Sequence, residues 1–167
     1  KDAYRKGIDE GWLSTSCKPE HGGMGVPTFF QAVTWAEFGT SACMALSVLP
    51  ALSIGVYEVL AANGRQDLID YFASNLASGE WAGTMCLTEP HAGTDLGIIT
   101  TRAEPEDDGT YRISGTKIFI TYGEHDMAEN IVHLVLAKAP GGPEGTKGIS
   151  LFLVPKYLPA EWESGGV

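Results

Sequence analysis

The sequence is poor in cysteine, and its few cysteines lack the spacing of a functional motif. Cys17, Cys43 and Cys86 are three in number among 167 residues, and they form no CxxC pair. Such a set predicts neither a disulfide framework nor a zinc site, and it favours a reducing compartment. The cysteine content therefore points away from small disulfide-bonded secreted scaffolds.

Basic side chains are also scarce, with 11 Lys and Arg against 21 Asp and Glu and a net charge of −10. Binding to nucleic acids or to anionic membranes needs clustered positive charge, so we expect neither partner. A membrane span needs about 20 apolar residues. The longest apolar stretch, Ala42 to Ala62, is interrupted by Pro50 and Glu58, so no membrane span is predicted.

The apolar residues, 44% of the chain, suffice for a core, and their spacing changes near residue 80. Helical spacing comes first, over Phe29–Phe38, Met44–Ala62 and Asp67–Leu76. Alternating patterns then predict six strands: Ala82–Leu87, Ile99–Ala103, Tyr111–Ser114, Lys117–Thr121, Ile131–Ala137 and Ile149–Val154. Helices followed by strands predict an α+β fold with a boundary near Gly79 to Trp81.

Two local features refine this picture. Asp108-Gly109 predicts a tight turn between the second and third strands. The aromatic residues of the helix Phe29–Phe38 are interpreted as core rather than as a partner-binding stripe.

The candidate chemistry lies in two segments, MCLTEPHAGTDL (residues 85–96) and GTKIFIT (residues 115–121). Thr88 and Thr121 each end an apolar run with a hydroxyl. On a strand, Phe119 and Thr121 project to the same face. An aromatic plane beside a hydroxyl suits a flavin, but it is also an ordinary core arrangement. Residue chemistry alone leaves both readings open.

The loop between Glu89 and Asp95 offers a second candidate element. Gly93 lets the backbone approach a ligand closely, and Thr94 places a hydroxyl beside that approach. The alternative is a surface turn in which Asp95 caps the following residues.

Three adjacent polar residues, Glu124-His125-Asp126, form the one cluster that suggests a metal. Neighbouring strand residues point to opposite faces, so three in a row rarely converge on one ion. We interpret them as a polar turn and predict no metal site.

The order of these motifs resembles the acyl-CoA dehydrogenase family across essentially the whole chain. The similarity includes TEPHAGTDL, the Asp-Gly hairpin, GTKIFIT and the strand IVHLVLA, and it extends to the upstream loop PEHGGMG (residues 19–25). The sequence is most similar to the 3-methylmercaptopropionyl-CoA dehydrogenase-like branch. The resemblance implies a helical amino-terminal domain over residues 1–80 and an antiparallel β-barrel-like middle domain over residues 81–167, with the family's carboxy-terminal helical domain absent.

The resemblance also implies six residues that contact an FAD cofactor: Met85, Leu87, Thr88, Thr94, Phe119 and Thr121. Thr88 would hydrogen-bond the pyrimidine portion of the flavin, and Thr121 would hydrogen-bond N5. Phe119 would pack against the isoalloxazine. Thr94 would touch the phosphate region of the flavin and the pantetheine of an acyl-CoA substrate.

Four positions depart from the commoner family pattern. Met85 replaces an aromatic residue, Thr94 replaces Ser and Phe119 replaces Trp, all with apolar or hydroxyl character kept. His91 replaces a small residue, and its bulk can alter the clearance for acyl or pantetheine groups.

The implied activity is α,β-dehydrogenation of an acyl-CoA thioester, with hydride transfer to flavin N5. The family's base is a glutamate of the carboxy-terminal domain, so no catalytic residue is assigned here, and Glu89 is interpreted as structural. We therefore expect a fragment that is inactive by itself and binds FAD weakly. An acyl-CoA oxidase and a non-catalytic acyl-CoA- or partner-binding domain remain alternatives.

The resemblance further implies partners and a location. Family members are homo-oligomers that pass electrons to an electron-transfer flavoprotein. A cytoplasmic bacterial protein is expected, with the mitochondrial matrix as the alternative.

Overall fold

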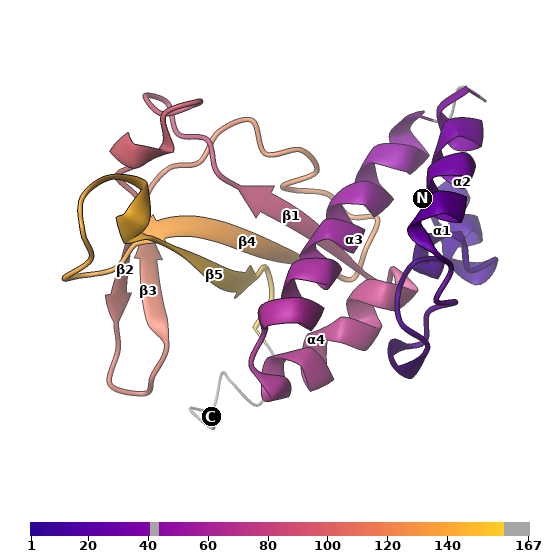
Figure 1. Ribbon diagram of the computed structural model, residues 1–167, viewed down its shortest axis with the longest axis horizontal. Coiled ribbons are helices and arrows are strands. Elements are labelled where there is room, and N and C mark those ends of the chain that lie inside the picture. The colour runs from indigo at the N-terminus through magenta and orange to yellow at the C-terminus, as the bar shows by residue number, and fades with distance from the viewer. Residues whose placement is uncertain (41–43, 159–167) are drawn as a thin grey trace. The chain divides into compact units, whose positions relative to one another are not determined.

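The computed structural model describes residues 1–40 and 44–158, with the backbone alone at residues 38, 39 and 44–50. Within these residues, four α-helices come first: α1 (Asp2–Asp9), α2 (Thr28–Thr40), α3 (Met44–Asn63) and α4 (Gln66–Ser78). Five strands follow in the described part of the chain: β1 (Trp81–Cys86), β2 (Arg102–Pro105), β3 (Tyr111–Ser114), β4 (Asn130–Lys138) and β5 (Ile149–Pro155). Figure 1 shows this succession of helices and strands. The predicted α+β class is confirmed.

Contacts divide the chain into two compact units, residues 1–84 with 122–132 and residues 85–121 with 133–167. The first unit contains all four α-helices, and the division falls inside β1 and β4. The domain boundary near residue 80 stays a prediction.

The core of the first unit is built from the periodic apolar faces of its helices. In α4 the buried residues are Phe72, Ala73, Leu76 and Ala77, which recur at the three- and four-residue spacing of one helical face. The ring of Phe72 meets that of Trp81 edge-on, with 5.6 Å between centroids. The hydroxyl of Tyr4 donates to the carbonyl of Gly79 over 2.7 Å, which ties α1 to the end of α4.

The aromatic start of α2 is exposed. Phe29, Phe30 and Val33 expose 74%, 58% and 50% of their surfaces. The interpretation of these residues as core is wrong. The helix is apolar on most sides, so its sequence does not show which side the rest of the unit covers.

The strands form one sheet in the order β1-β4-β2-β3, with β5 also paired to β4. β2 and β3 form an antiparallel hairpin (Figure 1), and Asp108-Gly109 makes its turn as predicted. Gly109 has φ 83°, a left-handed conformation that glycine adopts without strain. β2 meets β4 in parallel at Arg102 and Lys138, so the sheet is not antiparallel throughout.

Two predicted strands differ from the observed ones. Ile99–Ala103 was expected, but β2 begins at Arg102, because the backbone N–H groups of Thr100 and Thr101 donate to a buried carboxylate instead of a sheet ladder. The strand Lys117–Thr121 is wrong, since residues 115–120 are irregular. Within residues 1–40 and 44–158, no helix is long and apolar enough to cross a membrane.

Candidate functional site

The two motif segments meet just beyond the end of β1, within the second unit. The backbone N–H of Ile118 donates to the carbonyl oxygen of Thr88 over 2.9 Å. The chain from Gly115 to Thr121 is therefore held beside Thr88, although it forms no strand. This contact brings together two segments that lie 30 residues apart in sequence.

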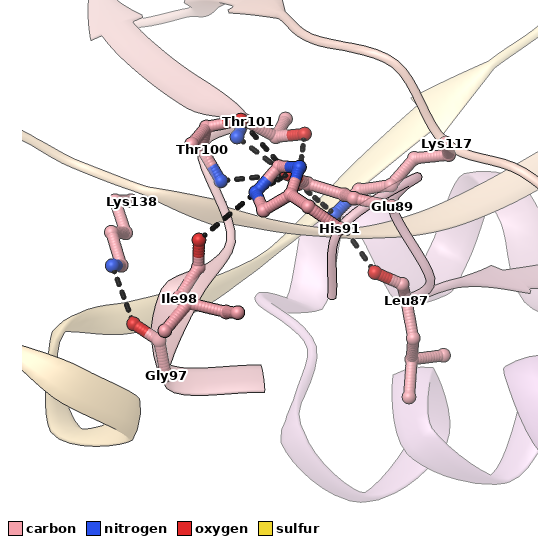
Figure 2. Close-up of polar contacts among 9 residues, drawn as sticks. All are labelled: Leu87, Glu89, His91, Gly97, Ile98, Thr100, Thr101, Lys117 and Lys138. Carbon is pink, nitrogen blue, oxygen red and sulfur yellow. Dashed lines mark hydrogen bonds and ion pairs between the residues drawn. The ribbon is translucent and has the colours of Figure 1, made fainter. Parts of the chain in front are cut away.

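The residue after Thr88, Glu89, has a buried carboxylate. Glu89 exposes 2% of its surface. Its Oε2 accepts from the backbone N–H and the hydroxyl of Thr100 at 2.7 and 3.0 Å, and its Oε1 accepts from the same two groups of Thr101. Lys117 Nζ donates to Oε1 over 2.9 Å. Figure 2 shows these donors gathered around the one carboxylate.

The charge of Glu89 is fixed by these donors. Burial alone raises the pKa of this carboxyl, but the hydrogen bonds from Thr100, Thr101 and Lys117 outweigh burial and hold the pKa well below its usual range. Glu89 is therefore an ionised anchor and a very weak base.

Lys117 contributes a second bond, to the residue directly after β1. Its Nζ donates to the carbonyl oxygen of Leu87 over 3.1 Å, in addition to its ion pair with Glu89 (Figure 2). Only 10% of the Lys117 side chain is exposed. The ammonium group of Lys117 thus bonds to both Leu87 and Glu89.

The loop after Glu89 is held by short-range bonds and by one bond from the distant Lys138. Asp95 Oδ1 accepts from the N–H of Gly97 over 3.0 Å, so the capping expected of Asp95 is confirmed. His91 Nε2 lies 3.1 Å from the carbonyl oxygen of Ile98 and 3.6 Å from Glu89 Oε2. Lys138 Nζ donates to the carbonyl of Gly97 over 2.7 Å (Figure 2). Thr94 lies exposed inside this loop.

All six residues predicted to contact a flavin belong to the second unit. Met85, Leu87 and Thr88 are half-buried at and after the end of β1, whereas Thr94 and Thr121 are exposed. The Thr88–Ile118 bond places Phe119 and Thr121 one and three residues from a direct contact with Thr88. Thr94 is placed on a separate loop.

Phe119 has an unusual conformation for an aromatic residue. Its φ is 56°, in the left-handed region, and 89% of its surface is exposed. Strand alternation therefore does not apply to Phe119 and Thr121, and the reason given for their sharing a face is wrong. Backbone strain of this kind concentrates at binding sites, where neighbouring structure maintains it.

Residues of the cluster Glu124-His125-Asp126 bond to a neighbouring residue and to the start of the chain. Asp126 pairs with Lys1 at 2.5 Å, and His125 Nδ1 accepts from the N–H of Met127 over 3.2 Å. In the described part of the chain, no group of three or more His, Cys, Asp or Glu residues is arranged to hold a metal ion.

The network of Glu89, Thr100, Thr101 and Lys117 was not predicted from the sequence. Its signal was an acidic residue shortly after the apolar run Met85–Leu87 and a lysine directly before the apolar run Ile118–Ile120. Pairing the two required knowledge of the fold, because 28 residues separate them.

Two family models match the sequence in succession. The acyl-CoA dehydrogenase N-terminal domain matches residues 1–80, and the acyl-CoA dehydrogenase middle domain matches residues 84–165. The chain belongs to the acyl-CoA dehydrogenase family. The resemblance seen in the motifs is thereby confirmed.

Individual relatives agree with this assignment. The chain is 50% identical to the 3-methylmercaptopropionyl-CoA dehydrogenase of Ruegeria pomeroyi over 161 residues, covering 96% of this chain and 27% of that protein. A solved structure of the electron transferring flavoprotein of Acidaminococcus fermentans matches with TM-score 0.79 and 26% identity, covering 93% of this chain and 40% of that one. The FAD complex of PigA matches with TM-score 0.79 and 25% identity, covering 95% and 40%. The chain therefore spans about a quarter of the Ruegeria pomeroyi protein and two fifths of each of these two solved chains.

Proposed function

We propose that this chain provides the amino-terminal helical domain and the flavin-facing part of the middle domain of an FAD-dependent acyl-CoA dehydrogenase. The observation that carries the proposal is the 2.9 Å bond from Ile118 N–H to Thr88 O, which assembles the two motif segments into one site. When bound, FAD supplies the two-electron acceptor for α,β-dehydrogenation of an acyl-CoA thioester.

The residues present fit a flavin. The hydroxyls of Thr88, Thr94 and Thr121 make no hydrogen bond to any residue that the structure describes, so they are available to a ligand. Phe119 offers an exposed ring, and Met85 and Leu87 offer half-buried apolar surface. Apolar walls with a few hydroxyl donors are what a flavin ring requires.

Each residue has a defined task in this proposal. Thr121 donates to N5, Thr88 donates to the pyrimidine edge, and Phe119 packs against the isoalloxazine. Thr94 contacts the flavin phosphate region and the pantetheine of the substrate. The catalytic base is assigned to the carboxy-terminal domain of the family, and Glu89 is not assigned this task, because its buried carboxylate is already bound by Thr100, Thr101 and Lys117.

The wider assignment follows from the relatives. A substrate of the acyl-CoA class is supported by the name of the Ruegeria pomeroyi protein, which acts on a thioether-containing acyl-CoA. We further propose that the intact protein is a homo-oligomer in the bacterial cytoplasm and passes its electrons to an electron-transfer flavoprotein.

Anaerobic reduction of the bound flavin tests the proposal. The intact protein should purify with FAD, and its visible flavin absorbance should bleach on addition of 3-methylmercaptopropionyl-CoA or butanoyl-CoA. Thr121→Val should slow bleaching by about tenfold to a hundredfold, since a hydrogen bond to the reacting centre is lost. Thr110→Val, which changes an exposed threonine of the β2–β3 hairpin, is the matched control and should bleach at the wild-type rate.

The same assay separates the alternatives. Bleaching followed by fast reoxidation in oxygen would identify an acyl-CoA oxidase. FAD or acyl-CoA binding without bleaching would identify a non-catalytic domain. Absence of FAD from the intact protein would contradict the proposed function.

A further inference from the structure

Among the residues that the structure describes, Glu89 and Lys117 form the most deeply buried pair of opposite charges, and the proposed chemistry does not use it. The side chains expose 1% and 10% of their surfaces. Burying two charges is costly, and an apolar pair of similar volume often stabilises a fold equally well. A buried ion pair of this kind is therefore expected to specify a local geometry and not chiefly to add stability.

The bonds of Lys117 show what that geometry is. Its ammonium group binds Leu87 O and Glu89 Oε1, which lie on either side of Thr88 in the chain. The next residue after Lys117, Ile118, donates to Thr88 itself. Residues 87–89 of the first segment are thus bonded to residues 117 and 118 of the second. The bonds are made by an ammonium group, a carboxylate and backbone groups, all of which favour a defined hydrogen-bond geometry.

We propose that Glu89 and Lys117 are positioning residues, which hold the Phe119–Thr121 segment against Thr88 so that both segments present their groups to one flavin ring. This role rests on the proposed function. Phe119 is kept in a left-handed conformation two residues after Lys117, with its ring in solvent. Strain of this kind persists only where neighbouring contacts over-determine the backbone, and the ion pair supplies those contacts.

A catalytic role for Glu89 is inconsistent with the same geometry. Both carboxylate oxygens already accept hydrogen bonds, five in total from Thr100, Thr101 and Lys117. A group that is saturated with donors and shielded from solvent neither reaches a substrate nor takes up a proton readily. Its contribution acts through the residues that it holds.

The test compares Lys117→Met with Thr101→Val in the intact, FAD-loaded protein. Both changes remove a donor from Glu89 Oε1, but only the first removes a connection between the two segments. In Lys117→Met we expect faster hydrogen exchange at the Ile118 amide and an altered visible spectrum of the bound flavin. The rate of flavin reduction at saturating butanoyl-CoA should fall by about tenfold or more, since small misplacements of reacting groups cost that much. The half-saturating concentration of butanoyl-CoA should change little.

Thr101→Val should lower thermal stability and leave the Ile118 exchange rate, the flavin spectrum and the reduction rate as in the wild type. Equal effects of the two variants would show a general structural role and overturn the inference, and so would wild-type behaviour of Lys117→Met. If Lys117→Met does not fold, Lys117→Gln decides by the same readouts, because it keeps a donor without the charge. Its expected reduction rate lies between those of the wild type and Thr121→Val, and an unchanged rate would overturn the inference.

The wild-type protein distinguishes this inference from the proposed function. A wild-type protein that holds no FAD, or whose flavin does not bleach, contradicts the proposed function and the positioning role with it. A wild-type protein that bleaches normally, with Lys117→Met bleaching equally fast, contradicts the positioning role alone.

Discussion

The backbone N–H of Ile118 lies 2.9 Å from the carbonyl oxygen of Thr88 and donates to it. This bond joins the end of β1 to an irregular segment whose aromatic residue, Phe119, faces solvent. The buried Glu89–Lys117 ion pair connects the same two segments a second time, next to this bond. The junction is what turns two separate sequence motifs into one candidate site.

The start of the irregular segment depends on a close approach to the carboxylate network. A Cβ atom placed on Gly115 would lie 2.3 Å from Thr101 Oγ1 and 2.8 Å from Thr101 Cα. We expect Gly115→Ala to destabilise the protein by about 1–3 kcal/mol, because the new methyl group displaces Thr101 from Glu89.

Chemical denaturation of the intact protein measures this effect. Gly55→Ala on α3 is the control, since a Cβ there meets nothing within 4 Å and alanine favours a helix. That variant should be as stable as the wild type or slightly more stable. A Gly115→Ala protein as stable as Gly55→Ala would contradict the packing described here.

A substitution at Gly93 tests ligand binding without changing the stability of the fold. Apart from the residues next to it in the chain, no described residue has an atom within 4 Å of a Cβ built at Gly93, and its φ is not left-handed. We therefore expect Gly93→Ala to leave the free energy of unfolding unchanged. The affinity for FAD or acyl-CoA should fall by about tenfold, as expected when a methyl group intrudes on a close contact. Equilibrium titration of the intact protein with each ligand gives the answer, and unchanged affinity for both would show that neither approaches Gly93.

The ionised state of Glu89 predicts a dependence of stability on pH. The pKa of Glu89 is lowered in the folded protein, so the unfolded chain binds a proton more readily. The stability contributed by the ionised carboxylate is fully present above the unfolded pKa, near 4.5, and is lost as the pH falls through the folded value. Glu89→Gln should therefore show a shallower loss of stability below about pH 4.5.

Unfolding measurements from about pH 2 to 6 test this expectation. Asp108→Asn is the matched control. The hydrogen bonds from the Thr110 hydroxyl and backbone N–H also lower the pKa of Asp108, but Asp108 lies on an exposed hairpin where water screens its charge. If the free energy of unfolding falls equally steeply at acid pH in the wild type and in Glu89→Gln, the hydrogen bonds to ionised Glu89 do not stabilise the folded state.

Local signals allowed much of the fold to be predicted. The Asp108-Gly109 turn forms where the dipeptide predicts it, because glycine supplies the left-handed residue of a tight turn. The helix predicted over Met44–Ala62 forms as α3 and extends one residue further, to Asn63. In these cases the controlling residues are adjacent in the chain.

Other features depended on partners that are distant in sequence. Alternation in GTKIFIT predicted a strand, but residues 115–120 form none. Ile118 bonds to Thr88, and the left-handed Phe119 prevents a regular ladder. The ladder expected from Ile99 was replaced by bonds from Thr100 and Thr101 to Glu89, 11 and 12 residues away. Exposure of Phe29 likewise depends on what the surrounding fold leaves uncovered. Periodicity describes a segment by itself and does not identify such partners.

A crystal structure of the intact protein with FAD tests the central claim most directly. We expect the hydroxyls of Thr88 and Thr121 both to lie within hydrogen-bonding distance of one isoalloxazine ring, about 3 Å, with the Phe119 ring packed against it. A flavin bound elsewhere, or the two hydroxyls on opposite surfaces and too far apart to reach one ring, would contradict the account.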